Sequence, residues 1–461
     1  MSTKHAIAAA RFLENKENEA WHDHTLWMVR TKRDKMSHSL PEWERLRELA
    51  SEIKLYSNSH LDTLLEEFEK NAIANGAIVH WAKDAEEHNE IVLRILRQHD
   101  ARNLIKSKSM LTEECHMNEF LMSKGIDVVE SDLGERILQL MHLAPSHIVM
   151  PAIHIKREQI SEMMEREMGT EKGNIDPTYL THAARKNLRE KFLHADVAMT
   201  GANFAVASTG EIVVCTNEGN ADMGTSFPKV HIATMGMEKI VPNLEALGVF
   251  TRLLARSGTG QPITSYTSHY RRPSEGQEFH IIIVDNGRSD ILAKPDHIRT
   301  LNCIRCGECM NTCPVYRRSG GYSYTYFIPG PIGINLGMAH DPEKYYDNLS
   351  ACSLCMSCSD VCPVKVDLAE QIYKWRQDLD GLGKANTGKK IMSGGMKFLM
   401  ERPALFNAAL WAAPMVNGLP RFMKYNDFDD WGKGRELPEF AKESFNEMWK
   451  KNEVQGKEES K

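Results

Sequence analysis

The chain has 461 residues, of which 42% are hydrophobic and 26% are charged, and its formal net charge is −6. This composition is typical of a globular protein that buries a sizeable core, and the length predicts more than one domain. The acidic balance gives no basis for nucleic-acid binding, and no apolar run is long enough to predict a transmembrane segment.

Residues 1–70 are predicted to form a helical arm. Apolar residues recur at helical spacing, as at Leu46, Leu49 and Ile53, and Pro41 stands where a first helical turn would begin. We expect this arm to pack against the next domain and to carry no chemistry.

Residues 71–295 are predicted to form an α/β domain, because short apolar segments alternate with amphipathic ones around what would be a largely parallel sheet. The expected strands are residues 77–81, 103–105, 126–129, 147–150, 196–199, 204–207, 211–214, 229–233 and 279–284. The expected helices are residues 90–98, 111–123, 134–143 and 243–256, with a helical insertion over residues 156–194.

Eight of the ten cysteines lie in residues 296–380 and form two copies of the spacing Cys-x2-Cys-x2-Cys-x3-Cys-Pro. This spacing holds cubane iron–sulfur clusters, and in two-cluster ferredoxins the fourth cysteine binds the other cluster. We therefore predict two [4Fe–4S] clusters, the first held by Cys303, Cys306, Cys309 and Cys362 and the second by Cys352, Cys355, Cys358 and Cys313. Disulfides or zinc are the alternatives, but neither requires overlapping CxxC pairs or a proline after each fourth cysteine.

The cysteine-rich domain is predicted to be a helical ferredoxin module, because its two motifs stand farther apart than in compact bacterial ferredoxins. A helix is expected over residues 368–379, and residues 381–461 are expected to form a polar tail that is helical in parts and disordered over residues 453–461. Since cluster ligands must stay reduced and no targeting segment is visible, we expect a cytoplasmic protein.

A candidate anion pocket lies in the α/β domain. Lys106 and Lys108 follow an expected strand and precede an expected helix, and open α/β sheets bind ligands at such junctions. The alternative is that Ser109 caps a helix beside two solvated lysines. Asn203 and Glu218, on turns beside other strands, are candidates for the same pocket.

Other polar and sulfur-containing residues carry weaker predictions. Cys115 and Cys215 are expected to be core thiols, and the 19 histidines show no metal-binding spacing, so none is predicted to be a ligand. Arg305 and Lys365, inside or just after the cysteine motifs, are candidates for raising the cluster potentials.

Nine segments occur here in a characteristic combination: Lys106–Met110, Thr200–Ala205, Thr209–Gly210, Asn217–Asn220, Asp285–Ser289, Cys303–Cys309, Cys313–Arg317, Gly330–Gly333 and Cys362–Lys365. In these segments the chain resembles the lactate utilization protein B family, whose members join a lactate-utilization (LUD) domain to a two-cluster ferredoxin module. The resemblance runs from about residue 50 to 380. The sequence departs from the family pattern at Ser208 and at residues 268–271.

The resemblance implies an electron-transfer subunit of a three-protein system that oxidises L-lactate to pyruvate. Its partners would be a cysteine-rich oxidoreductase subunit and a second LUD-domain protein. The LUD domain is similar in fold to CoA transferases and ribose-phosphate isomerases, which makes Glu218 the one catalytic candidate, as a nucleophile. The alternative is that Glu218 is a turn residue with no reactive role. Two alternatives stay open. In the first, the chain is an iron–sulfur subunit of another 2-hydroxy acid oxidase, such as a glycolate oxidase, or of a heterodisulfide reductase-like system. In the second, it is a redox or metabolite sensor.

Overall fold

The computed structural model describes residues 3–381, 383, 387–424 and 438–450. They form two compact units, residues 3–376 and the residues from 377 onward. The predicted disorder of residues 453–461 lies outside the described residues.

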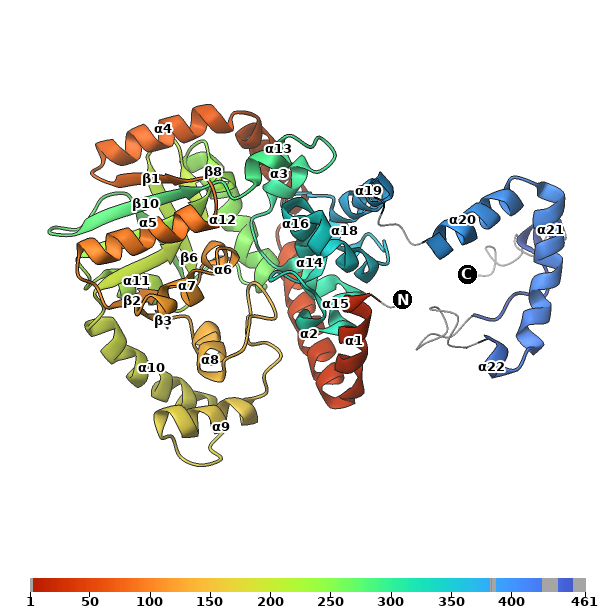
Figure 1. Cartoon of the computed structure of the whole chain (residues 1–461), viewed down its shortest axis with the longest axis horizontal. Helices are drawn as coiled ribbons and strands as arrows, with labels where there is room; N and C mark the ends of the chain where they lie inside the picture. The colour runs from red at the N-terminus through yellow and green to blue at the C-terminus, as the bar shows by residue number, and fades with distance from the viewer. Residues whose placement is uncertain (1–2, 382, 384–386, 425–437, 451–461) are drawn as a thin grey trace. The chain divides into compact units, whose positions relative to one another are not determined.

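Four helices form the N-terminal arm: α1 (Lys4–Glu14), α2 (Lys16–His38), α3 (Trp43–Ser59) and α4 (Leu61–Ala74). Side-chain caps define the N-termini of α1 and α2, because the side chain of Thr3 accepts a hydrogen bond from the backbone N–H of Ala6 and that of Asn15 accepts one from the backbone N–H of Asn18. In Figure 1, α1 and α2 lie beside the cysteine-rich helices, whereas α4 lies over the large sheet. The arm therefore joins both parts of the first unit.

A six-stranded sheet lies at the centre of the α/β domain, and all of its strand pairs are parallel. In spatial order its strands are β1 (Ile78–Ala82), β10 (Glu278–Val284), β7 (Val230–Gly236), β4 (Val197–Gly201), β2 (Asn103–Lys106) and β3 (Asp127–Glu130). This confirms the predicted fold class of a largely parallel α/β domain.

Helices precede or follow these strands along the chain. They are α5 (Ala85–Gln98), α6 (Met110–Glu114), α7 (Met117–Ser123), α8 (Leu133–Met141), α9 (Arg157–Met168), α10 (Pro177–Leu193), α11 (Asn220–Thr225), α12 (Leu244–Gly258), α13 (Arg288–Leu292) and the 3-10 turn η1 (Met237–Lys239). The single helix expected over residues 111–123 is two helices, because His116 adopts a left-handed backbone with φ 50° between them.

Both faces of the sheet are buried, as the apolar runs of its strands predict. Val230 and Ile232 pack with α5 and α7 on one face, and Ala233 and Met235 pack with α4 and a second sheet on the other. Successive side chains of a strand point to opposite faces, so one strand contributes to both cores.

The second sheet has the strand order β8 (Ile240–Val241), β5 (Phe204–Val206), β6 (Glu211–Thr216) and β9 (Tyr266–Tyr270). β5 and β6 are antiparallel around the expected turn at Gly210, whose φ is 68°. A Cβ at Gly210 would lie 2.3 Å from the backbone nitrogen of Ala72 in α4. The close approach of α4 to this turn therefore requires glycine.

Residues 147–150 form a bend and not the expected strand. Nδ1 of His147 accepts hydrogen bonds from the backbone N–H groups of Val149 and Met150, each at 3.1 Å. Such local hydrogen bonds compete with strand pairing. Nε2 of His147 lies 3.1 Å from Oδ1 of Asn311 in the cysteine-rich part. This apolar segment therefore packs between the two parts of the unit.

The cysteine-rich part is helical, as predicted. Its elements are η2 (Ile298–Asn302), α14 (Glu308–Thr312), α15 (Pro314–Ser319), η3 (Gly321–Ser323), α16 (Gly330–His340), α17 (Pro342–Tyr345), η4 (Tyr346–Ala351), α18 (Ser357–Val361) and α19 (Leu368–Gly381).

The second unit contains α20 (Thr387–Met400), α21 (Pro403–Ala412), η5 (Ala413–Gly418), α22 (Arg421–Lys424) and α23 (Phe445–Lys450). Large apolar side chains such as Ile391 and Trp411 are exposed among the described residues of this unit. Among the described residues, no helix is both long enough and apolar enough for a membrane span.

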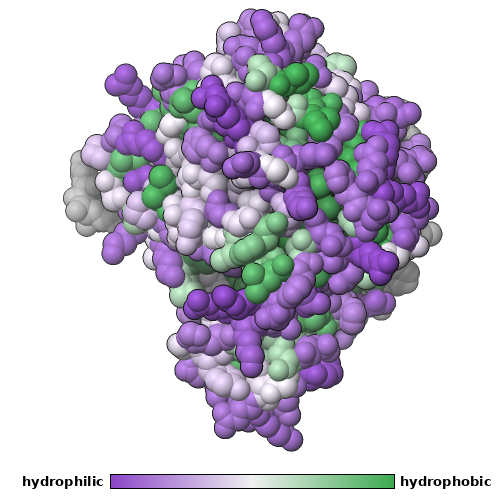
Figure 2. Space-filling model, turned by 90° about the vertical axis from the view of Figure 1, so that its left-hand side faces the viewer, coloured by the Kyte–Doolittle hydropathy of each residue, from purple (hydrophilic) through white to green (hydrophobic). Residues whose placement is uncertain are grey.

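Figure 2 shows the side of the α/β domain that lies at the left in Figure 1. This face is predominantly hydrophilic, and its apolar residues form small separate patches. The face in view therefore has no single broad apolar surface.

Candidate functional site

The two cysteine motifs lie on loops of the same conformation. Arg305 and Gly307 in the first loop have φ values of 60° and 80°, and Leu354 and Met356 at the matching positions of the second have 55° and 64°. Residues other than glycine rarely adopt this left-handed backbone. Arg305, Leu354 and Met356 adopt it at matching positions, which indicates that both loops are constrained to the same strained backbone conformation.

Backbone N–H groups point at four of the cysteine sulfurs. The donor–sulfur pairs, at 3.3–3.5 Å, are Arg305–Cys303, Leu354–Cys352, Tyr316–Cys313 and Val366–Cys362. A hydrogen bond to sulfur stabilises its negative charge. Burial raises the pKa of Cys313, Cys352 and Cys362, and these N–H groups act against that rise, toward the thiolate form in which cysteine binds metals.

The eight motif cysteines line two pockets. The first pocket is lined by Cys303, Cys306, Cys309 and Cys362. The second pocket is lined by Cys313, Cys352, Cys355 and Cys358. Each pocket takes three cysteines from one motif and the fourth from the other, which supports the crossed assignment predicted from the spacing.

The chemistry of the pocket walls fits an iron–sulfur cluster. Besides its sulfurs, the first pocket is lined by Gly307 and by the apolar residues Ile148, Ile304, Ile332, Pro363, Val364, Val366 and Leu368. Four sulfur donors in an apolar pocket are the ligands that iron–sulfur clusters use. All ten cysteines lie within the described residues and none is in a disulfide, so the sulfurs are free to bind metal.

Two short helices link the pockets. α14 runs between Cys309 of the first pocket and Cys313 of the second, and α18 runs between Cys358 of the second and Cys362 of the first. The two helices contact each other. A five-residue helix is about 7.5 Å long, so the two pockets are close neighbours.

The pockets differ in their exposure to solvent. Cys306, Cys309 and Cys362 of the first pocket are buried, whereas Cys355 of the second is exposed. Met356 on the second loop is 47% exposed. The second pocket therefore lies nearer to the surface of the unit.

The N-terminal arm positions both loops, a role that the sequence analysis missed. Arg47 of α3 donates to the carbonyl oxygen of Cys362 at 3.0 Å, and Arg33 of α2 donates to that of Val361 at 3.0 Å. Arg33 also lies 3.7 Å from the buried carboxylate of Glu308 in α14. An arginine within the apolar stripe of an arm helix is the signal that could have revealed this role.

A network of largely buried charges lies between the first pocket and the carboxyl edge of the large sheet. Its four cations and two carboxylates are Lys54, Lys239, Arg288, Arg305, Glu114 and Glu238. Glu238 in η1, directly after β7, lies 3.6 Å from Arg305 and pairs with Arg288. Although burial opposes it, Arg288, Lys239 and Arg305 lower the pKa of Glu238 to about 2. Four cations against two carboxylates leave two net positive charges beside the first pocket.

Lys106 lies buried among carboxylates at the carboxyl end of β2. Its Nζ is 2.8 Å from Glu130 and 2.9 Å from Glu113, and it donates to the hydroxyl of Thr112 at 3.0 Å. Although burial opposes it, Glu113, Glu130 and Glu135 raise the pKa of Lys106 above its ordinary value. The charge of Lys106 is therefore neutralised within the protein, and its role in binding an anion stays a prediction.

The other pocket candidates are only partly brought together. Lys108 donates to the carbonyl oxygen of Val149 at 3.0 Å, and its charge acts on the carboxylate of Glu218, which accepts from the backbone of Leu133 at 3.0 Å. Asn203 instead accepts from the backbone of Cys215 at 2.8 Å and joins the strands of the second sheet. Lys108 and Glu218 thus lie near each other, whereas the side chain of Asn203 is used in a hydrogen bond to the backbone of the second sheet.

Replacing Glu218 by glutamine is expected to change how stability depends on pH. Glu218 is exposed as a whole residue, but desolvation of its carboxylate, followed by the charge of Asp132, raises its pKa from 4.5 to about 7. A raised acid pKa means that the folded state holds the proton more tightly, so this residue's contribution to stability falls as pH rises from about 4.5 to about 7. The Tm of Glu218→Gln relative to wild type should therefore be higher at about pH 8 than at about pH 5, measured by scanning calorimetry. Glu162→Gln on the exposed side of α9 is the control, and a pH-independent difference for Glu218→Gln would contradict this assignment.

Comparison with known proteins matches both parts of the chain. A family model described as a LUD domain matches residues 65–291, and one described as a 4Fe-4S dicluster domain matches residues 299–366, which indicates two [4Fe–4S] clusters. Lactate utilization protein B of Bacillus pumilus (strain SAFR-032) is 42% identical over 434 residues, which cover 90% of each chain. The protein of the same name from Shouchella clausii (strain KSM-K16) is 40% identical over 443 residues, 93% of this chain and 92% of the relative.

Two further proteins are similar to the chain. The uncharacterized electron transport protein YkgF of Escherichia coli (strain K12) is 39% identical over 437 residues, 92% of each chain. The crystal structure of a DUF162 family protein from Deinococcus radiodurans is 16% identical, with a TM-score of 0.27, and the match covers 49% of this chain and 98% of that one.

Proposed function

Because the chain belongs to the lactate utilization protein B family, we propose that it is the iron–sulfur electron-transfer subunit of a cytoplasmic complex that oxidises L-lactate to pyruvate. The observation that carries this proposal is the pair of crossed cysteine pockets joined by α14 and α18. A bound [4Fe–4S] cluster accepts and releases one electron at a time, so two neighbouring clusters suit the stepwise removal of the two electrons of lactate.

The chain holds the two pockets in different surroundings. Arg305 of the first loop reaches Glu238 at the carboxyl edge of the sheet, and a Cβ at Gly258 of α12 would lie 3.0 Å from the carbonyl oxygen of Cys306. The first pocket therefore faces the α/β domain. The second pocket, with its exposed Cys355, is the one that a partner protein can approach. We assign the contacts with the cysteine-rich oxidoreductase subunit to the second pocket, and a second LUD-domain protein completes the proposed complex.

Replacing Arg305 by glutamine is expected to lower the reduction potential of the first pocket's cluster. Reduction adds negative charge, so losing a nearby cation destabilises the reduced state. A unit charge about 8 Å away contributes roughly 2 kcal/mol at an effective dielectric constant of about 20, which is roughly 90 mV for one electron. Anaerobic redox titration followed by EPR measures the shift.

A matched variant assigns that shift to one pocket. Arg376 donates to the carbonyl oxygen of Cys352 at 2.5 Å, beside the second pocket. Arg376→Gln should therefore shift the EPR signal of the second pocket's cluster. The signal of the first pocket's cluster, which Arg305→Gln shifts, should not change. No shift in Arg305→Gln, or the same signal shifted by both variants, would show that these arginines do not tune separate clusters.

The function is tested by reconstitution. The chain is purified anaerobically, alone and together with the cysteine-rich subunit and the second LUD-domain protein, and EPR spectra are recorded after addition of L-lactate. Signals of reduced clusters should appear with L-lactate only when the partners are present, and dithionite should reduce the clusters in every sample. Reduction by glycolate and not by lactate would identify another 2-hydroxy acid oxidase. Lack of reduction by either substrate, with dithionite still effective, would favour the sensor alternative.

A further inference from the structure

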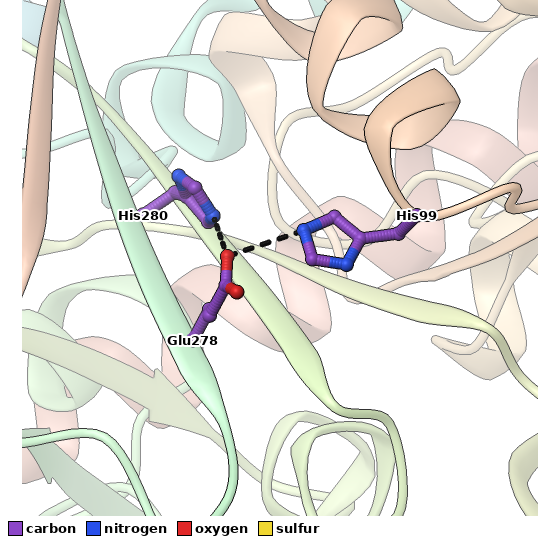
Figure 3. A group of neighbouring side chains, drawn as sticks. All are labelled: His99, Glu278 and His280. Atoms are coloured by element: carbon purple, nitrogen blue, oxygen red, sulfur yellow. Dashed lines mark hydrogen bonds and ion pairs between the residues drawn. The ribbon is translucent and has the colours of Figure 1, made fainter.

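Two histidines and one glutamate meet at the amino edge of the large sheet (Figure 3). Nε2 of His99 lies 3.1 Å, and Nε2 of His280 lies 3.3 Å, from the same carboxylate oxygen, Oε2 of Glu278. The three possible ligand atoms lie within 4.8 Å of one another. No spacing in the sequence pointed to this group, because His99 stands 179 residues before Glu278.

The fold explains how these side chains meet. Glu278 and His280 lie two residues apart at the start of β10, so their side chains point to the same face of the sheet. That face is covered by α5, whose C-cap is His99. The group lies at the opposite edge of the sheet from Glu238 and the first pocket, and nothing in the proposed electron transfer uses it.

A fourth residue orients His280. Its Nδ1 lies 3.0 Å from Nε2 of His80 on the neighbouring strand β1, and the two rings stack at an interplanar angle of 17°. A histidine that binds a metal donates its other N–H to an acceptor, and this second contact fixes the ring. Nε2 of His80 is therefore placed to accept a hydrogen bond from Nδ1 of His280 and to fix the orientation of that ring.

We propose that His99, Glu278 and His280 bind one divalent transition-metal ion of the Zn²⁺ type. Two imidazole nitrogens and one carboxylate form a donor set that zinc uses with a fourth, exchangeable ligand. Bond lengths of about 2.0–2.2 Å place neighbouring ligand atoms of a tetrahedral site roughly 3.3–3.5 Å apart, close to the two separations between the imidazole nitrogens and the Glu278 oxygen. The side chains of Glu278 and His99 are 50% and 29% exposed, so solvent can supply the fourth ligand. The ion would link the end of α5 to β10.

The test uses the anaerobically purified protein with its clusters intact, titrated with ZnCl₂ in a calorimeter. Wild type should bind one zinc per chain without loss of iron. His99→Gln and Glu278→Gln should weaken binding by at least about tenfold, and His80→Leu by about 10–100-fold through the lost orientation of His280. His182→Gln, an exposed histidine on α10, is the matched control and should bind like wild type.

Two further measurements keep the result unambiguous. Unchanged cluster absorbance and Tm in the variants show that they are folded, and the zinc X-ray absorption spectrum should show nitrogen and oxygen neighbours. The proposal is overturned by an absence of zinc binding in wild type, by zinc binding as tight as that of wild type in His99→Gln and Glu278→Gln, or by sulfur neighbours with a matching loss of iron.

Discussion

Cys362→Ser is expected to remove the cluster of the first pocket and to spare that of the second, although Cys362 belongs to the second motif. The structure groups Cys362 with three cysteines of the first motif. Without its fourth sulfur that cluster loses a ligand, and iron should fall from about eight toward about four atoms per chain. Iron analysis and EPR after dithionite reduction measure what remains.

Four variants compared in pairs make this test decisive. Cys303→Ser and Cys362→Ser should leave the same EPR spectrum, that of the second cluster. Cys352→Ser and Cys313→Ser should leave the other spectrum. Cys115→Ser, which removes a buried thiol outside the motifs, should keep both clusters. If the spectrum of Cys362→Ser instead matches that of Cys352→Ser, the ligands are not crossed and each motif holds its own cluster.

Lys106→Met is expected to destabilise the α/β domain by about 3–5 kcal/mol, the usual result of removing one partner from a buried ion pair. The Nζ of Lys106 lies within 3 Å of both Glu113 and Glu130, and its side chain is fully buried. Methionine fills much of the same volume but leaves these carboxylates without their cation. Denaturant unfolding of the cluster-loaded protein, followed by circular dichroism, measures the loss.

Two comparisons separate this structural role from ligand binding. Lys83→Met, at a lysine whose side chain is 78% exposed, should change stability by less than about 0.5 kcal/mol. Glu130→Gln added to Lys106→Met should recover part of the loss, because it removes one of the stranded charges. If Lys106→Met is as stable as Lys83→Met, the lysine is not needed to neutralise these carboxylates, and the anion-pocket prediction gains weight.

Features carried by local pattern were accessible from the sequence. The parallel α/β fold follows from runs of apolar residues such as those of β7 and β10, which must be buried on both faces. The two cysteine motifs predict two clusters because their spacing wraps a short loop around a cube. Because the fourth cysteine of such a motif binds the other cluster, the spacing also predicted that each cluster takes three cysteines from one motif and one from the other, and the linings of the two pockets support this assignment.

Features that depend on distant partners were not accessible. The segment 147–150 has the composition of a strand, but the side chain of His147 bonds to its own backbone and to Asn311. In the sequence, Arg33 and Arg47 look like ordinary residues of a packing arm. Arg47 nevertheless donates to the carbonyl oxygen of the second motif's last cysteine, and Arg33 donates to that of the residue before it. Asn311, Val361 and Cys362 each stand more than a hundred residues from the side chain that contacts them.

The sequence by itself determined the chemistry of the cysteine loops and the class of the fold, because thiolate spacing and hydrophobic periodicity act over a few residues. Only the tertiary structure decided what surrounds them: the cations beside the first pocket, the exposure of the second, the carboxylates around Lys106 and the meeting of His99 with Glu278 and His280. Charges and ligands act through space, and distances through space are set by how the strands and helices pack.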